Sequence, residues 1–303
     1  MGYLRSDFAH TSSRADTHPI RVARLGRAID MHSTPALTPD TTIAIVGAGR
    51  LGGVLARALR AAGFVVLGPL GRDDRMPDAD VALLCVPDSA IAAVAFAARP
   101  HARLVAHVSG ATPLTDVDFS LHPLQTFIGK ETSEAFRDVG VAVDGRTPEA
   151  LEMAEALARA LGANPFRVDD AHRAEYHAAA SFASNFVLTV LDAAEHLAKN
   201  AGVDRAHLAP LVRQTVDNWA ASGAASALTG PIARGDDDTV ARQRAASADY
   251  RDLFDALATA TRAVAGRAPR AATTDTNDAD TTATDTTTDT TADHAATTEE
   301  PGA

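Results

Sequence analysis

The sequence contains very little cysteine, lysine and tryptophan, and it has no long apolar run. Its single cysteine, Cys85, lies in an apolar segment, which excludes an internal disulfide framework and favours a reducing compartment. No apolar stretch approaches the roughly 18 residues typical of a membrane-spanning helix. The polar N-terminal region has no apolar core of a secretory signal. These absences predict a cytoplasmic protein that does not contact a membrane.

The charge is negative overall and unevenly distributed. The formal net charge is −11, and residues 270–303 alone carry eight acidic residues against one arginine. No basic face is left for nucleic acid, so no such partner is predicted. Only two of the 28 basic residues are lysines, Lys130 and Lys199, which limits the candidates for a proton donor.

Composition and hydrophobic periodicity divide the chain into four parts. Residues 1–39 and the Thr/Asp-rich residues 268–303 have too few apolar side chains to pack, and we predict a disordered extension and a disordered acidic tail. Residues 40–168 alternate short apolar strands with helical segments, whereas residues 169–267 show only alanine-rich helical periodicity. The fold class is therefore α/β, with a Rossmann-type parallel sheet domain followed by an all-helical domain. The helical domain could also bury a face against a second subunit, so a homodimer is predicted.

The segment around residues 41–62 carries the strongest motif. A buried strand at 43–46 is followed by Gly47, Gly49 and Gly52 in the spacing G-x-G-x-x-G, and then by a helix. This context is typical of dinucleotide binding, because the glycines let a pyrophosphate approach the backbone at the N-terminus of the helix. The predicted cofactor contacts here are Gly47, Gly49, Arg50, Leu51 and Gly52.

The segment after the second predicted strand, 64–67, indicates which dinucleotide is bound. An NAD enzyme would place an acidic residue at the end of this strand, whereas here Arg72 follows. An arginine can pair with the 2′-phosphate of NADP in bidentate fashion, so NADP is the predicted cofactor. The third strand, 81–86, ends at Val86 and is followed by Pro87 and Asp88. We expect these three residues to contact the cofactor, and Asp88 also to cap the next helix.

Polar residues at the ends of later strands are candidates for catalysis. Further strands are predicted at 104–108, 119–121, 140–143 and 165–168, with a helix at 148–161. Ser109 and His122 stand where the first two of these strands end, the edge at which open parallel sheets bind ligands. His122 could equally be a structural histidine.

In the helical domain, His177, Ser181 and Asn185 are spaced for one helix face that is otherwise apolar. They either line an active site or bond one another. We predict catalytic roles for His177 and Asn185 and substrate binding for Ser181. The segment 229–239 contains glycine and proline breaks around Arg234 and Asp236, which we predict to bind a carboxylate substrate, although an ordinary turn with an ion pair is the alternative. No metal site is predicted.

These motifs, taken in order, resemble a known family. They include Val86-Pro-Asp88, His107-Val-Ser-Gly110, the run from Leu121 to Phe127, Tyr176-His177 with Asn185, and the run from Gly230 to Asp236. Over residues 41–265 the chain is similar to two-domain proteins with a Rossmann-like part and a domain of unknown function, DUF2520. The segment between Gly110 and Leu121 is shorter than is usual for that family.

The resemblance implies an NADP-dependent oxidoreductase laid out like ketopantoate reductases and pyrroline-carboxylate reductases. It implies reduction of a small 2-oxo acid, with ketopantoate as the most specific expectation. Reduction of an imine of the pyrroline-carboxylate type and a non-catalytic NADP sensor remain alternatives. Related enzymes use a lysine where this chain has His177, so the proton donor is predicted to be His177, with His122 as its rival.

Overall fold

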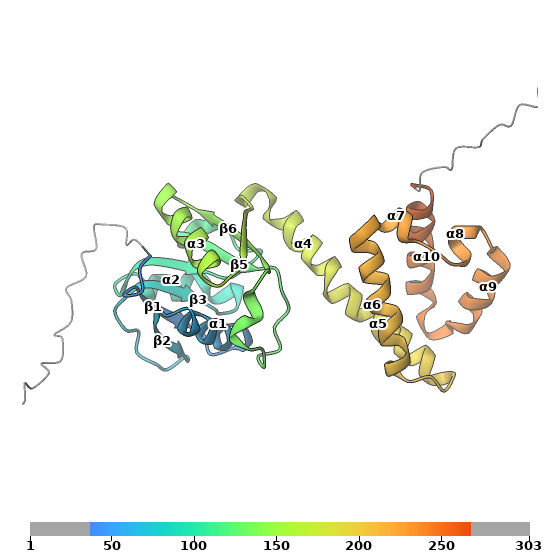
Figure 1. Cartoon of the computed structure of the whole chain (residues 1–303), viewed down its shortest axis with the longest axis horizontal. Coiled ribbons are helices and arrows are strands. Elements are labelled where there is room, and N and C mark those ends of the chain that lie inside the picture. The colour runs from blue at the N-terminus through green and yellow to red at the C-terminus, as the bar shows by residue number, and fades with distance from the viewer. Residues whose placement is uncertain (1–36, 268–303) are drawn as a thin grey trace, which may run out of the picture. The chain divides into compact units, whose positions relative to one another are not determined.

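The computed structural model describes residues 37–267 (Figure 1). Contacts within the chain divide it into two units, and the boundary in the sequence falls between Asp192 and Ala193. The two predicted disordered segments lie outside the described residues, apart from residues 37–39 of the first.

A seven-stranded sheet forms the first unit, with its strands in the order β2-β1-β3-β4-β5-β6-β7 (Figure 1). The flanking helices make this the predicted α/β, Rossmann-like architecture, which is confirmed. The strands are β1 (Thr42–Val46), β2 (Val65–Leu70), β3 (Ala79–Leu84), β4 (Ala102–His107), β5 (Phe119–Pro123), β6 (Gly140–Gly145) and β7 (Asn164–Arg167).

One strand pair departs from the predicted parallel arrangement. Strands β1 to β5 are parallel and β7 is parallel to β6, but β6 runs antiparallel to β5. After β5 the chain forms the short 3₁₀ turn Ser133–Phe136 and returns in the opposite direction as β6.

Strand β2 is longer than the sequence predicted. It continues past Leu67 through Gly68 and a cis Pro69 to Leu70. Proline lacks the N–H that a central strand needs, and it is accommodated here because β2 is the edge of the sheet. Gly68 has φ 93°, and a Cβ there would lie 2.7 Å from the carbonyl oxygen of Ile45, so only glycine fits.

Two apolar clusters hold helices on opposite faces of the sheet. Helices α1 (Arg50–Ala61) and α3 (Pro148–Ala160) bury Leu55, Leu59 and Leu157 against one face. Helix α2 (Ile91–Ala98) packs on the other face through Ile91 and Ala95. The sheet is thus covered on both sides around β1 and β3, which leaves the carboxyl ends of the strands as the edge for ligands.

The remaining helices are α4 (Arg173–Ala183), α5 (Asn185–Asn200), α6 (Arg205–Ser222), α7 (Ala224–Ala227), α8 (Pro231–Arg234), α9 (Asp237–Ala246) and α10 (Arg251–Ala265). In the second unit, α10 packs against α7, α8 and α9. The absence of strands after Arg167 in the described residues agrees with the predicted all-helical C-terminal region.

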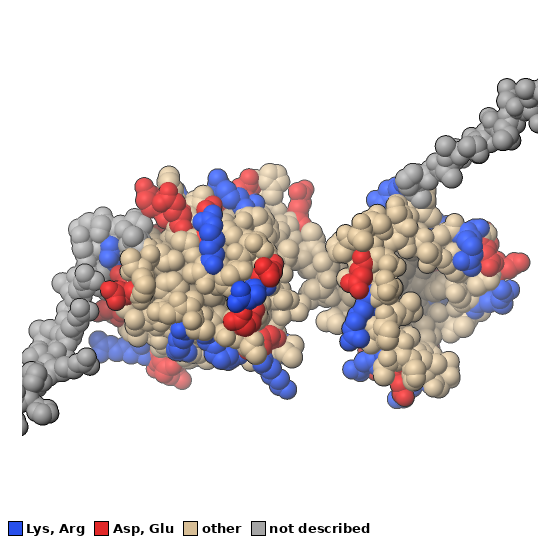
Figure 2. Space-filling model, viewed as in Figure 1, with Lys and Arg blue, Asp and Glu red and all other residues tan. Residues whose placement is uncertain are grey.

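Charge on the visible face is mixed. Figure 2 shows basic and acidic side chains interspersed over both units. Between residues 37 and 267, no helix is both long and apolar enough to cross a membrane.

Candidate active site

The glycine turn after β1 is shaped by contacts that exclude side chains at two of its three positions. Gly47 has φ 116°, and a Cβ on it would lie 2.2 Å from the carbonyl oxygen of Cys85. A Cβ on Gly52 would lie 2.0 Å from the carbonyl oxygen of Gly47, so α1 can approach the turn only because this residue is glycine. Gly49 differs, because a Cβ there would meet no atom within 4 Å. The turn is therefore closely packed on the protein side and open beside Gly49.

The N-terminus of α1 meets the requirements of an anion site. Gly49 is its N-cap and supplies no side-chain hydrogen bond, and the first turn contains no acidic residue. The first N–H groups of a helix have no partner within the helix, and they carry the positive end of its dipole. Arg50 and Leu51 form this first turn, so the predicted phosphate contacts lie where the backbone can bind a phosphate.

A pocket of about 390 Å³ lies beside the glycine turn. Four of the predicted cofactor residues line it, namely Gly47, Arg72, Val86 and Pro87. The remainder of its wall is mostly apolar, with contributions from Val46, Ala48, Leu70, Met76, Ala90, Ala93, Val94, Ala97 and Ala98. An apolar slot with an arginine at its rim fits an adenosine that carries a phosphate.

Two acidic residues near this pocket behave differently from the prediction. Asp88 was predicted to cap a helix, but it makes no capping hydrogen bond and instead begins a 3₁₀ turn ahead of α2. Asp74, which was not predicted, lines the pocket, and its carboxylate accepts the N–H of Gly71 at 2.7 Å. Because Gly71 directly follows β2, this carboxylate orders the loop that carries Arg72.

A second group of polar side chains lies on one face of β4, β5 and β6. Ser120 pairs with His107 on one side and with Asp144 on the other. Residues opposite each other on neighbouring strands project from the same face. His122 is two residues beyond Ser120 and so shares that face. The sheet thus presents a polar surface on β4, β5 and β6.

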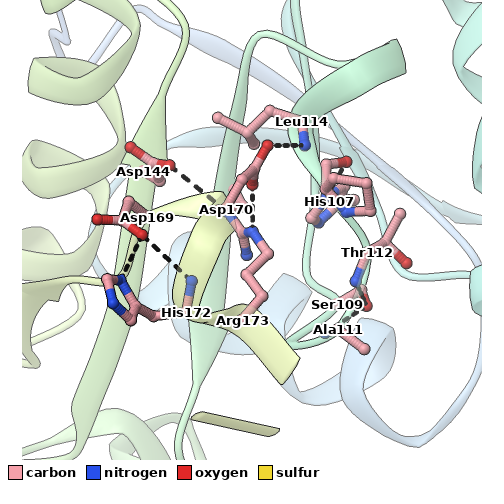
Figure 3. Close-up of polar contacts among 12 residues, drawn as sticks. His107, Ser109, Ala111, Thr112, Leu114, Asp144, Asp169, Asp170, His172 and Arg173 are labelled. Carbon is pink, nitrogen blue, oxygen red and sulfur yellow. Dashed lines mark hydrogen bonds and ion pairs between the residues drawn. The ribbon is translucent and has the colours of Figure 1, made fainter. Parts of the chain in front are cut away.

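Arg173, at the start of α4, is the charged centre of this surface (Figure 3). Its side chain is 4 % exposed; Nε donates to Asp170 at 2.5 Å, and Nη2 donates to the hydroxyl of Ser120 at 2.7 Å. A carboxylate oxygen of Asp144 lies 3.9 Å from Nη2. The other carboxylate oxygen of Asp170 accepts the N–H of Leu114, so the same aspartate also fixes the loop after β4.

His122 and Tyr176 form the shortest histidine contact of this surface. The Tyr176 hydroxyl lies 2.6 Å from Nδ1 of His122, and the rings of Phe166 and Tyr176 make an edge-to-face contact. Burial lowers the pKa of His122 to about 4, with further lowering by His177 and Arg173. Burial also raises the pKa of Tyr176 to about 12. At neutral pH the pair is therefore an uncharged imidazole and an uncharged phenol.

His107 is fully buried beside this pair. Its Nε2 lies 3.3 Å from the carbonyl oxygen of Pro113, and Nδ1 has no hydrogen-bond partner within the described residues. Burial is the main reason that its pKa is lowered. A buried imidazole nitrogen without a hydrogen-bond partner destabilises the fold, and such groups are typical of functional sites. This surface is therefore a candidate functional site.

The other predicted residues of the first unit are placed as follows. The Ser109 hydroxyl accepts the N–H groups of Ala111 and Thr112, so it shapes the loop after β4. His177 is exposed, with its ring centroid 6.3 Å from that of His122, and its carbonyl accepts the hydroxyl of Ser181. The predicted single helix face does not extend to Asn185, because Ser184 interrupts the helix and Asn185 begins α5.

Arg234 and Asp236 belong to the second unit. Gly235 adopts a left-handed conformation between them, and Asp236 caps α9 by accepting the N–H of Thr239 at 3.0 Å. The exposed Arg234 guanidinium forms no hydrogen bond or ion pair with other described residues. The hydrogen bonds from Thr239, and after them the charges of Arg242 and Arg234, lower the pKa of Asp236. Asp236 therefore has a structural role, and the hydrogen-bond donors of Arg234 stay available for an anion.

The sequence prediction missed Ser120, Arg173 and Tyr176 as site residues. The spacing Ser120-x-His122 on a strand that is otherwise apolar was an available signal, since it places two polar side chains on one face. Nothing local indicated their partners, which are more than 50 residues away along the chain.

Comparison with known proteins adds two findings. Residues 139–261 match the family described as domain of unknown function DUF2520. No curated protein matches the chain.

Two solved structures are similar over 74% of this chain and 99% of their own. One is a candidate NADP oxidoreductase from Bacteroides fragilis, with 23% identity and a TM-score of 0.66. The other is a protein from Thermotoga maritima, with 22% identity and a TM-score of 0.64. At these identities the likeness shows a shared fold. Residues 139–261, which include strands β6 and β7 of the sheet, are therefore similar to the DUF2520 family.

Proposed function

We propose that this chain is an NADPH-dependent reductase of a small 2-oxo acid, with ketopantoate as the specific substrate. The main support is the order of chemical groups along one edge of the sheet. Arg72 follows β2, Gly47 follows β1, Pro87 lies just beyond β3 and His122 lies at the end of β5. Four strand spacings separate β2 from β5, about 19 Å. A dinucleotide with its adenosine at Arg72 and its pyrophosphate at the glycine turn would extend toward His122.

The residues present fit such a cofactor. The open space beside Gly49 and the uncapped start of α1 would hold the pyrophosphate, and the apolar pocket would hold the adenosine. The similar fold of the B. fragilis protein, described as a candidate NADP oxidoreductase, supports the same assignment. When bound, NADPH supplies a hydride to the carbonyl carbon of the substrate.

The protein's task is then to hold the carbonyl and to supply a proton to its oxygen. We assign this role to the His122–Tyr176 pair. With the Tyr176 hydroxyl donating to Nδ1, the neutral imidazole carries its own hydrogen on Nε2, from which it can donate to the developing alkoxide. His177 lies next to this pair and is the second candidate.

Turnover is the direct test of this function. Oxidation of NADPH is measured with a panel of 2-oxo acids that includes ketopantoate, and with cyclic imines such as pyrroline-5-carboxylate. We expect turnover with ketopantoate and conversion to the 2-hydroxy acid. Tight NADPH binding without turnover of any compound would instead support a sensor, and turnover of imines alone would support the imine reductase.

Arg72 is predicted to set the cofactor preference. We expect NADPH to bind at least tenfold more tightly than NADH, about 1.4 kcal/mol, because a guanidinium at the pocket rim can pair with the 2′-phosphate. Arg72→Ala should remove most of this difference in titrations with the two cofactors. Arg75→Ala is the matched control, since Arg75 is in the same loop but does not line the pocket. Equal affinities in the unmodified protein would contradict the NADP assignment.

Arg234 is proposed to bind the substrate carboxylate. Its guanidinium is exposed and makes no hydrogen bond or ion pair within the described residues, and arginine suits bidentate pairing with a carboxylate. Arg234→Lys should raise the KM for ketopantoate about tenfold or more and leave the NADPH Kd unchanged. The control is Arg242→Lys, because Arg242 is exposed on the neighbouring helix and already bonds Thr239. A loss of NADPH binding in Arg234→Lys would contradict the role.

A homodimer is also part of the proposal. Its support is the set of large apolar side chains that α6 exposes, Leu211, Val216 and Trp219, which are 65%, 49% and 58% accessible. Large aromatic and aliphatic side chains exposed to this extent are often buried when a protein interface forms.

A further inference from the structure

We propose that Arg173 is a positioning residue: its guanidinium fixes the first turn of α4 on β5 and thereby holds the Tyr176 hydroxyl on the ring of His122. This inference rests on the proposed function, because it concerns the same proton-donating pair. Arg173 itself does not line the cofactor pocket.

The two elements match because each places two polar side chains on one side at a similar spacing. On β5, Ser120 and His122 are two residues apart and project from one face. On α4, Arg173 and Tyr176 are three residues apart and lie on one side of the helix. Arg173 bonds Ser120 at 2.7 Å and Tyr176 contacts His122 at 2.6 Å, so two parallel contacts dock the helix on the strand. A shift at the first contact is transmitted to the second.

The first contact is the better anchored of the two. Arg173 is almost fully buried and joins three elements: Ser120 on β5, Asp144 on β6 and Asp170 before α4. Asp170 in turn holds the N–H of Leu114. Figure 3 shows the guanidinium directed at Asp170, with Asp144 close by. A planar guanidinium can bond several acceptors in fixed directions, which a lysine ammonium on a flexible stem cannot reproduce.

The charge of Arg173 has a second effect on the pair. Besides Arg173, the charged or titratable groups around His122 are Tyr176 and His177 from α4, His107 from β4 and Asp88 from the turn after β3. Burial, His177, Arg173 and His107 lower the pKa of His122, whereas Asp88 raises it. A neutral His122 keeps Nδ1 available to accept from the tyrosine. Arg173 therefore favours the protonation state that the pair requires.

The test uses the full chain and three substitutions. Arg173→Lys keeps the positive charge but loses the planar set of guanidinium donors. Arg173→Met removes the charge and the donors. Tyr176→Phe removes the hydroxyl that Arg173 is proposed to position. Each is measured for NADPH Kd, for kcat and KM with ketopantoate, and for the pH titration of the His122 ring by NMR. His122→Gln identifies the ring signal.

We expect Arg173→Lys to lower kcat about tenfold, as Tyr176→Phe does, with the NADPH Kd unchanged, because only the alignment of the donor is lost. In Arg173→Met the His122 ring should become protonated at a higher pH than the value of about 4 in the unmodified protein. A merely structural arginine would lower stability but would leave both the kcat of the folded variant and the histidine titration unchanged. Unchanged kcat and unchanged titration in a folded Arg173 variant therefore overturn the proposal.

Two further outcomes are also decisive. If neither Arg173 variant folds, Ser120→Ala removes one partner of the guanidinium and keeps the charge; a reduced kcat with an unchanged KM supports the proposal, and an unchanged kcat overturns it. If the protein reduces no compound of the panel, the proposed function fails. The histidine titration then decides alone: a raised pKa of His122 in Arg173→Met supports the coupling, and an unchanged pKa overturns it.

Discussion

His122→Gln is expected to lower kcat with ketopantoate about 100-fold or more, within the range that general acid catalysis contributes. His122 stands at the carboxyl end of β5 with Nδ1 engaged by Tyr176, which leaves Nε2 as the nitrogen that can donate to a substrate. Glutamine retains a donor of similar reach but cannot relay a proton between two nitrogens. The NADPH Kd should change by less than about threefold, because His122 does not line the adenosine pocket.

His177→Gln is the matched comparison, since it removes an imidazole one residue from Tyr176 on the same helix. Its ring centroid lies 6.3 Å from that of His122, and its smaller expected effect would arise through the surroundings of the pair. A near-normal kcat in His122→Gln combined with a collapse in His177→Gln would reverse the two roles. Normal turnover in both variants would remove the histidines from the mechanism.

The same assignment gives a pH dependence. The folded-state pKa of His122 is lowered to about 4 from an ordinary value of 6.5, so the imidazole is neutral throughout pH 5 to 8. Protonation of His122 should therefore not lower kcat as the pH falls through 6.5. It should lower kcat only as the pH approaches 4. The contribution of His122 to folding stability falls earlier, as the pH drops from 6.5 to about 4, because the unfolded chain binds the proton first.

Gly49→Ala is expected to raise the NADPH Kd about 30-fold or more, close to 2 kcal/mol, while the protein remains folded. The backbone at Gly49 has φ −75°, which alanine adopts readily, and the added methyl group meets no protein atom within 4 Å. It would occupy the space that the pyrophosphate needs against the N-terminus of α1. The Kd comes from calorimetric titration, and the melting temperature shows that the fold is intact.

Gly53→Ala is the control for this substitution. It adds the same methyl group to α1 one turn later, where the nearest atom is the Arg57 guanidinium at 3.7 Å. It should leave the NADPH Kd unchanged and raise stability slightly, since alanine favours a helix interior. If Gly49→Ala bound NADPH normally, the phosphate would have to lie elsewhere.

The sequence indicated the glycine turn correctly because every determinant of that turn lies within about 20 residues. The seven strands were also recognisable, most of them as short apolar runs. The direction of β6 was not, because it depends on how the chain crosses between β5 and β6. The extension of β2 through Pro69 was missed because proline is acceptable only on an edge, and edge position is a property of the whole sheet.

The candidate site was harder to predict than the fold. His122 was identified from its place at a strand end, whereas its partner Tyr176 is 54 residues further along the chain. Arg173 looks like an ordinary surface arginine in the sequence, and only the packing of α4 on β5 buries it. The expected face shared by His177 and Asn185 assumed an uninterrupted helix, and local composition gives no sign of the interruption at Ser184.

Cys85 contacts the glycine turn, so the chemical reactivity of its thiol depends on the state of that turn. Burial raises the pKa of this thiol to about 12, so at neutral pH almost none of it is thiolate, the form that alkylating reagents attack. Its backbone oxygen blocks a Cβ at Gly47, and its Cβ lies 3.2 Å from the position of a Cβ on Gly52. Cys85 is partly buried and the chain has one cysteine, so its rate of alkylation reports on solvent access to this turn. We expect a dinucleotide bound at the glycine turn to slow the alkylation of Cys85.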